Sequence, residues 1–349
     1  MHIPDGFLSA PTAAAAGALS FGAVAYSVRK ATNELSERTV PLLGVTAAFV
    51  FAAQMLNFPV AGGTSGHFLG AVLVAALMGP YAATVVLTSV LLVQSLVMAD
   101  GGITALGANV LNMAVIGGML GYLIFVGLKR LFPRTVTGYF VSLTIASWLS
   151  VVLASVACSL ELAASGTVPL SFALPAMSSV HMIIGIGEAL ITSTVVAAVL
   201  ASRPDLVRSY DLSSGPLARG KTGVFGRRGR VWGFAACAGV VAVALAIFVS
   251  PFASRSPDAL AKVAASNATA SAAATQPVWD QAPLKDYIFP GIHASGEAKA
   301  IAGGIGTVFL FGLVLMVGRL LGRRKAAPCA GPSPDGPSPA WGGPGADAA

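Results

Sequence analysis

The chain has 349 residues, of which 55% are hydrophobic and only 10% are charged, whereas about a quarter of the residues in a soluble domain are charged. Its apolar residues form long runs, which excludes an ordinary soluble fold and predicts an all-α, polytopic membrane helical bundle. The formal net charge of +7 does not indicate a nucleic-acid partner, because the Lys and Arg residues lie in clusters between apolar runs, where they determine membrane topology.

The chain begins MHIPDGFLS, and no basic residue precedes its first apolar run. A cleaved signal peptide is therefore not expected, because such peptides carry a positively charged region before the apolar one. We expect the mature chain to begin at Met1 and to keep it, since the bulky His2 hinders removal of the initiator methionine.

About nine apolar runs are candidates to cross the hydrocarbon core. We predict spans at residues 12–28, 40–56, 68–79, 81–98, 103–128, 137–162, 173–201, 231–253 and 301–321. Residues 68–98 could instead form one long helix kinked at Pro80. We predict two crossings there, because with the N-terminus outside they place the basic clusters at 129–134 and 203–230 in the cytoplasm.

This pattern predicts two modules in the bacterial cytoplasmic (inner) membrane. A seven-span module occupies residues 1–201, and a basic cytoplasmic linker follows at 202–230. A two-span module at 231–325 carries an extracytoplasmic loop at 254–300, and the C-terminus lies inside. Residues 326–349 are rich in Pro, Gly and Ala and are predicted to be a disordered tail.

Two features of the sequence suggest chemistry that their context excludes. Residues 215–222, GPLARGKT, fit the phosphate-binding loop pattern but lie in the polar linker, without the preceding strand and following helix that the motif needs. Cys158, Cys237 and Cys329 have none of the spacings of a zinc site or a disulfide framework, and we interpret them as inert. We expect no organic cofactor.

Two of the four histidines, His2 and His67, lie on the same outer face in the predicted topology. The Met1 amine, the deprotonated His2 backbone nitrogen and the His2 imidazole can chelate one metal through fused five- and six-membered rings. A fourth nitrogen from His67 would complete a square, the geometry that selects Ni(II) or Cu(II). Glycines in the preceding loop would allow the tight turn this requires. Alternatively, His67 caps the following helix or lies at the membrane interface.

Polar residues within or beside membrane spans are candidates for function. Gln94, Asp100 and Asn109 are predicted near the outer end, where they could orient the N-terminal loop around the metal. Ser65 and His181 are further candidates for this supporting role. The alternative for each is an interhelical hydrogen bond that fixes packing, and we favour that interpretation for Glu188.

Four segments carry a family resemblance: MHIPDGFLS, NFPVAGGTSGHFLG, QSLVMADGGITALGANVLNMA and HMIIGIGEALIT. In this order they resemble the substrate-capture subunits of energy-coupling-factor nickel/cobalt transporters (NikM/CbiM type), over essentially residues 1–201. The resemblance implies a metal bound by Met1, His2 and His67 in the square-planar manner. It also implies a membrane coupling subunit and two cytoplasmic ATPase subunits as partners, and no catalytic activity in this chain.

The C-terminal module resembles the small two-span companion subunit of such systems (NikN type), here fused to the capture module. SPDALAKVA and LKDYIFPGI look like its motifs, although Ala259 stands where related sequences commonly have glycine. The Tyr-x-x-Pro-Gly stretch from Tyr287 to Gly291 accompanies nickel more than cobalt in this family. The resemblance thus implies Ni2+ as the transported substrate, with Co2+ for cobalamin synthesis as the alternative.

Two other classes of function remain to be weighed. A self-contained secondary metal carrier would have broken helices with ionisable residues at mid-membrane, for which only Glu188 and His181 qualify. An intramembrane metalloenzyme would need a closely spaced ligand pair such as H-E-x-x-H, which the sequence does not contain. We therefore predict a non-catalytic metal-capture component.

Overall fold

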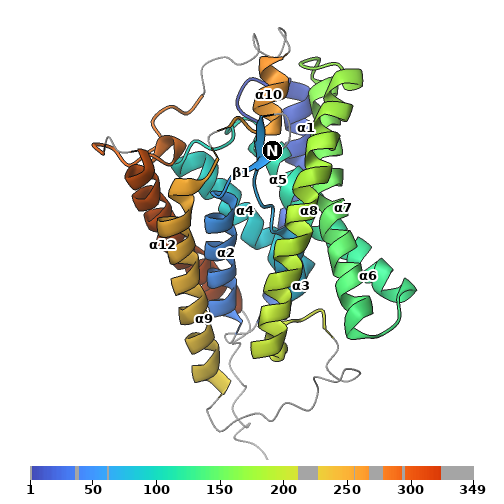
Figure 1. Ribbon diagram of the computed structural model, residues 1–349, viewed down its shortest axis with the longest axis vertical. Helices are drawn as coiled ribbons and strands as arrows, with labels where there is room; N and C mark the ends of the chain where they lie inside the picture. Colours follow the sequence, from blue (N-terminus) through green and yellow to red (C-terminus); the bar gives the residue numbers. More distant parts are fainter. Residues whose placement is uncertain are drawn as a thin grey trace, which may run out of the picture.

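Long apolar helices dominate the computed structural model, which describes residues 2–35, 39–60, 63–210, 227–254, 256–266, 278–292 and 295–323 (Figure 1). The α-helices are α1 (Ala10–Glu34), α2 (Val40–Gln54), α3 (Ala71–Met78), α4 (Pro80–Val97), α5 (Leu106–Val110), α6 (Gly121–Leu131), α7 (Val136–Ala164), α8 (Leu170–Ser202), α9 (Arg227–Ala244), α10 (Ala259–Ala265) and α12 (Ser295–Arg323). Short π- and 3-10-helical segments are η1 (Leu111–Leu120), η2 (Pro204–Leu206), η4 (Leu245–Val249), η5 (Ser250–Phe252) and η6 (Lys285–Tyr287). The strands β1 (Phe58–Val60) and β2 (Thr64–Gly66) form an antiparallel hairpin.

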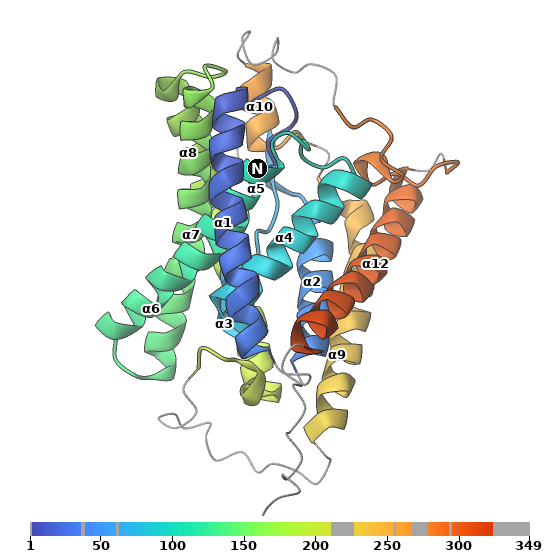
Figure 2. The ribbon, with the colours of Figure 1, turned by 180° about the vertical axis from the view of Figure 1, so that it is seen from behind.

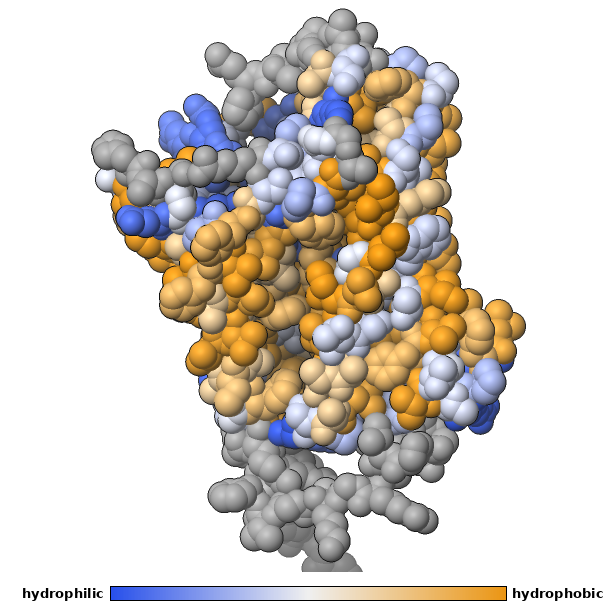
Figure 3. All heavy atoms as spheres, in the orientation of Figure 1, coloured by the Kyte–Doolittle hydropathy of each residue, from blue (hydrophilic) through white to orange (hydrophobic). Residues whose placement is uncertain are grey.

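Seven helical stretches in the described residues are long and apolar enough to cross a membrane. They are Ala10–Glu34, Pro80–Val97, Leu106–Leu131, Val136–Ala164, Leu170–Ser202, Val231–Phe252 and Gly296–Gly322. Large apolar side chains point outward from them, for example Phe21 and Phe248, which are 77% and 71% exposed. In Figure 3 apolar residues fill the middle of the molecule, while hydrophilic ones gather toward its two ends. The protein is therefore a multi-pass membrane protein.

The basic loops between the spans meet at one end of the bundle. The Lys129 ammonium, at the end of α6, donates to the Ser209 carbonyl at 2.6 Å. Arg208 pairs with Glu34, at the end of α1, at 2.9 Å. The N-terminal loop, the β-hairpin and α10 lie at the opposite end (Figures 1 and 2). The clusters at 129–134 and 203–210 therefore share one end, as predicted; that this end faces the cytoplasm stays a prediction.

The structure differs from the prediction at two of the predicted spans. The predicted crossing helix at residues 68–79 is wrong, because only Ala71–Met78 is helical, about 12 Å at 1.5 Å per residue. Non-helical chain from His67 to Gly70 leads into it, and Gly79 separates it from α4. The span at 40–56 is a helix of 15 residues. Both are shorter than the roughly 20 residues that a straight crossing needs, and the number of crossings stays a prediction.

The two C-terminal spans pack against α2. A β-carbon at Gly44 of α2 would lie 3.1 Å from the Phe311 carbonyl of α12, and one at Gly306 would lie 2.6 Å from the Phe51 ring of α2. Such close approach through small residues is how membrane helices associate. Several features discussed from the sequence lie outside the described residues: Met1, the segment 215–222, Cys329 and the tail at 326–349.

Candidate metal centre

The N-terminal loop is held in the bundle by backbone hydrogen bonds at Ile3. The Ile3 amide donates to Asn109 Oδ1 at 2.8 Å, and Asn109 Nδ2 donates back to the Ile3 carbonyl at 3.1 Å. The Gly102 amide donates to the same carbonyl at 2.9 Å. Ile3 and Asn109 are 0% and 2% exposed, so these bonds are shielded from water and fix the residue that follows His2.

Asp5 provides a second anchor for the loop. Its Oδ1 accepts from the Thr104 amide at 2.9 Å and the Thr104 hydroxyl at 2.6 Å, and its Oδ2 accepts from the Val278 amide at 3.0 Å. The loop packs so closely that a β-carbon on Gly102 would collide with the backbone nitrogen of Asp5. Glycine at 102 is therefore a condition of this docking.

The docked loop brings His2 beside His67. Their ring centres are 5.0 Å apart and their planes differ by 25°. Two imidazoles at adjacent corners of a square, each about 2 Å from a metal, would have ring centres about 4 to 5 Å apart. Within the described ranges, no group of three or more His, Cys, Asp or Glu side chains could hold a metal ion.

Both imidazoles lie in surroundings that favour their neutral form. The His2 side chain is 7% exposed, and burial lowers its pKa below the ordinary value of 6.5. Burial likewise lowers the pKa of His67 well below 6.5. Because a metal binds the neutral imidazole, both rings are in the state suited to coordination at neutral pH.

The two ring nitrogens of His2 face different side chains. Its Nε2 lies 3.1 Å from Gln94 Oε1, and Gln94 Nε2 donates to Gln54 Oε1 at 2.9 Å. Its Nδ1 lies 3.4 Å from Asp100 Oδ1. The other oxygen of Asp100 accepts from the Tyr287 hydroxyl at 2.6 Å, and burial raises the pKa of Tyr287, which keeps that hydroxyl protonated.

The loop that joins the last two spans, Val231–Phe252 and Gly296–Gly322, is called the C-terminal loop here, and it reaches the surroundings of both histidines. Besides Tyr287, its Leu284 and Asp286 amides donate to the carbonyls of Val97 and Met98, at 2.9 and 2.8 Å. On the other side, the Ser65 amide donates to the Pro257 carbonyl at 2.9 Å, and its hydroxyl donates to the Ser256 carbonyl at 2.6 Å. Through these two bonds Ser65 fixes β2 to the loop.

His67 follows β2 and begins the non-helical stretch before α3. Its Nδ1 donates to the Phe68 carbonyl at 3.1 Å, which leaves Nε2 as the nitrogen with a lone pair. Two residues on, the Leu69 and Gly70 amides donate to the two carboxyl oxygens of Glu188, at 2.7 and 2.8 Å. Glu188 is 0% exposed, so it fixes the non-helical segment that carries His67.

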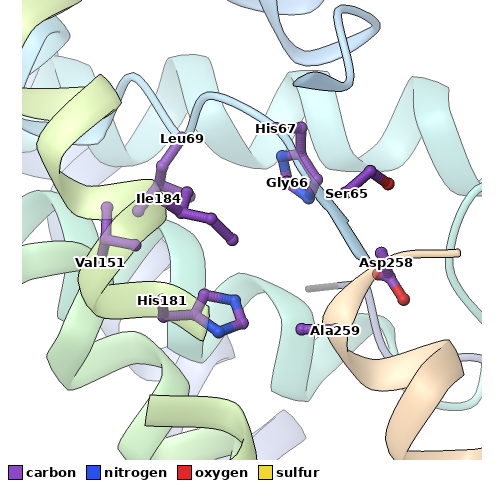
Figure 4. Close-up of a pocket in the computed structure, with 9 residues that line it drawn as sticks. All are labelled: Ser65, Gly66, His67, Leu69, Val151, His181, Ile184, Asp258 and Ala259. Carbon is purple, nitrogen blue, oxygen red and sulfur yellow. The ribbon is translucent and has the colours of Figure 1, made fainter. Parts of the chain in front are cut away.

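A small cavity separates His67 from His181 (Figure 4). The two rings come from the β2–α3 segment and from α8, and Asp258 and Ala259 of the C-terminal loop complete its wall. His181 Nδ1 donates to the Met177 carbonyl at 2.7 Å, which orients its ring. His181 therefore lines the same cavity as His67.

The structure gathers most of the predicted residues at one end of the bundle. Gln94, Asp100 and Asn109 contact the N-terminal loop, and Ser65 and His181 lie around His67. Sequence reasoning missed Asp5 and Gln54 as supporting residues. The Pro-Asp-Gly sequence indicates a turn at Asp5, which could have drawn attention to that residue. Nothing in the local pattern distinguishes Gln54 from a polar residue that fixes helix packing.

Comparisons with known proteins place this site in context. The family described as CbiM, "Cobalt uptake substrate-specific transmembrane region", matches residues 2–206, and the PDGLE domain matches residues 232–323. A putative fused nickel transport protein NikMN of Archaeoglobus fulgidus is 40% identical over 209 residues, covering 59% of this chain and 68% of that protein. The cobalt transport protein CbiM of Geobacter sulfurreducens is 32% identical over 213 residues, or 59% of this chain and 61% of that protein.

A solved structure is also similar. The "Crystal Structure of an Truncated Transition metal Transporter" is 36% identical, with a TM-score of 0.52, and the match covers 58% of this chain and 99% of that one. The helical bundle and these similarities thus define a membrane component of nickel or cobalt transport. The chain belongs to the CbiM family of cobalt uptake substrate-specific transmembrane regions, and a PDGLE domain follows in the same chain.

Proposed function

We propose that this chain captures Ni(II) at the extracytoplasmic face as the substrate-binding component of an energy-coupling-factor uptake transporter. The observation that carries the proposal is the His2–His67 pair, with ring centres 5.0 Å apart at the end of the bundle where the N-terminal loop is anchored. The names of the nickel-transport relatives support the choice of substrate.

The proposed donor set is four nitrogens. The Met1 amine, the His2 backbone nitrogen and His2 Nδ1 form fused five- and six-membered chelate rings, and His67 Nε2 supplies the fourth corner. A planar set of nitrogens suits Ni(II), whereas Zn(II) prefers a tetrahedral site and Mg(II) prefers six oxygens. Asp100 adds a negative charge beside the His2 ring, which favours a cation there.

The proposed division of the chain follows the predicted modules. Residues 1–201 form the capture module in the inner membrane, and residues 231–325 form the two-span companion, whose loop contacts Asp100 and Ser65 beside the histidine pair. A separate membrane coupling subunit and two cytoplasmic ATPases would supply the energy for uptake.

The test is nickel stoichiometry in the purified full-length chain with its authentic N-terminus. We expect one nickel per chain, and loss of that nickel in His67→Ala and in a variant with extra residues before Met1. Thr46→Val is a suitable control, because the Thr46 hydroxyl donates to the Leu42 carbonyl of its own helix. Full nickel binding by both altered chains would refute the proposed site.

Cobalt is the second candidate substrate, since the matched family and a relative are named for cobalt. Competition between equal concentrations of Ni(II) and Co(II) for the metal-free chain decides between them. We expect nickel to be retained, because the planar site that deprotonated nitrogens create favours it.

A further inference from the structure

Two buried glutamines link the His2 ring to the chain segment that carries His67. Gln54 Nε2 donates to the Leu69 carbonyl at 2.9 Å, Gln94 Nε2 donates to Gln54 Oε1 at 2.9 Å, and Gln94 Oε1 lies 3.1 Å from His2 Nε2. Gln54 and Gln94 are 4% and 0% exposed, so water does not compete for these bonds. Leu69 is two residues after His67.

The direction of donation along this chain of hydrogen bonds follows from the Leu69 carbonyl at its end. A backbone carbonyl can only accept, so the Gln54 amide must present its NH2 group to Leu69 and its oxygen to Gln94. Gln94 must then present its NH2 group to Gln54 and its oxygen to His2. An amide oxygen can only accept, so His2 Nε2 must carry the proton. The assignment of both amides thus rests on the carbonyl and not on a choice between nitrogen and oxygen positions.

We infer that Gln54 and Gln94 are positioning residues that hold His2 as its Nε2–H tautomer before a metal arrives. Because a neutral imidazole carries one proton, Nδ1 then keeps its lone pair. That nitrogen is the one that closes a six-membered chelate ring with the His2 backbone nitrogen. This role in metal capture rests on the function proposed above.

The position of Asp100 explains why the chain of hydrogen bonds through Gln54 and Gln94, called the relay below, is needed. Its carboxylate lies 3.4 Å from His2 Nδ1 and, as an acceptor, would favour a proton on that nitrogen. A proton on Nδ1 would block the lone pair needed for the metal. The relay favours the opposite tautomer, so that Nδ1 and the Asp100 carboxylate face each other as two electron-rich groups, an arrangement that attracts a cation.

The test measures the His2 tautomer in the metal-free full-length chain, by the 15N chemical shifts of labelled histidine rings, with the His2 signals assigned from a His2→Ala spectrum. We expect a protonated Nε2 and an unprotonated Nδ1 in the unaltered chain. Gln94→Met removes the acceptor and should shift the proton toward Nδ1. Gln54→Met frees the Gln94 amide to rotate and should give a mixture of tautomers.

A conservative substitution separates positioning from simple packing. In Gln94→Glu, a protonated carboxyl group can donate to Gln54 and accept from His2, so the tautomer of the unaltered chain should be restored. We expect nickel affinity to fall about 10- to 100-fold in Gln94→Met, a usual loss for residues that orient a metal ligand. Gln94→Glu should recover most of that loss. Thr46→Val, about two turns before Gln54 in α2, should change neither the His2 tautomer nor the nickel affinity.

Three outcomes would overturn the inference: Nδ1–H in the unaltered chain, an unchanged tautomer in both methionine variants, or no restoration by Gln94→Glu. The proposed function fails separately. If the unaltered chain has Nε2–H and the variants shift it, but nickel does not bind at His2 and His67, the relay stands and the capture proposal falls.

Discussion

Replacing Asn109 by leucine should undock the N-terminal loop without disturbing the helix that carries it. Leucine has a similar size but cannot form the two hydrogen bonds to the Ile3 backbone. The Ile3 carbonyl keeps the Gly102 amide as a donor, but the Ile3 amide is left buried without an acceptor. The loss of two bonds with one buried donor unsatisfied costs about 2 to 4 kcal/mol.

At 1.4 kcal/mol per tenfold, this cost lowers the docking equilibrium by roughly 30- to 700-fold. Nickel affinity falls by up to that factor, because only the docked loop brings His2 to His67. Competition with a coloured chelator measures the affinity. Asn112→Leu is the matched control: Asn112 lies three residues on, is 1% exposed, and donates to Glu161 at 2.7 Å. Equal nickel affinities in the two variants would refute the docking argument.

Three further perturbations test separate parts of the site. Tyr287→Phe removes the hydroxyl that donates to Asp100, and nickel affinity measured by titration should fall several-fold. The control Trp279→Phe removes a donor to the Leu96 carbonyl and should leave nickel affinity unchanged. Glu188→Gln replaces one of two acceptors of the Leu69 and Gly70 amides, so the chain should unfold at a lower temperature and the amides at 67–70 should exchange hydrogen faster; unchanged exchange there would contradict this role. Burial lowers the pKa of both histidines below 6.5, so they stay neutral as the pH falls toward 6.5. Only the Met1 amine, with a pKa of about 8, and the His2 backbone amide then lose a proton to solvent when the metal binds. The logarithm of nickel affinity should therefore rise with a slope of about two per pH unit between about pH 6.5 and 7.5, and a slope near four would show that the imidazoles also titrate there.

The sequence could predict the residues whose positions follow from topology. His2 and His67 were expected on one face because the charge clusters set the direction of the intervening spans, and Gln94, Asp100 and Asn109 because they are polar residues near the outer ends of apolar runs. The structure brings all five together. It also makes Tyr287 and Asp5 part of the arrangement, and these contacts join segments far apart in the chain, which local patterns do not specify.

Hydropathy alone does not predict that α3 is short. Residues 68–79 are as apolar as a membrane span, and within a bilayer unpaired backbone groups favour a helix. Here side chains replace the helical bonds before α3, since Glu188 accepts from the Leu69 and Gly70 amides and Gln54 donates to the Leu69 carbonyl. Composition cannot reveal such tertiary partners, so the break and the role of Gln54 were not predictable.

The absorption spectrum of the nickel-loaded full-length chain, purified with its authentic N-terminus, tests the central claim most directly. A planar four-nitrogen site predicts a diamagnetic, yellow Ni(II) species with a d-d band, which disappears when residues are added before Met1. A paramagnetic six-coordinate spectrum, or an unchanged yellow species in the extended chain, would contradict it.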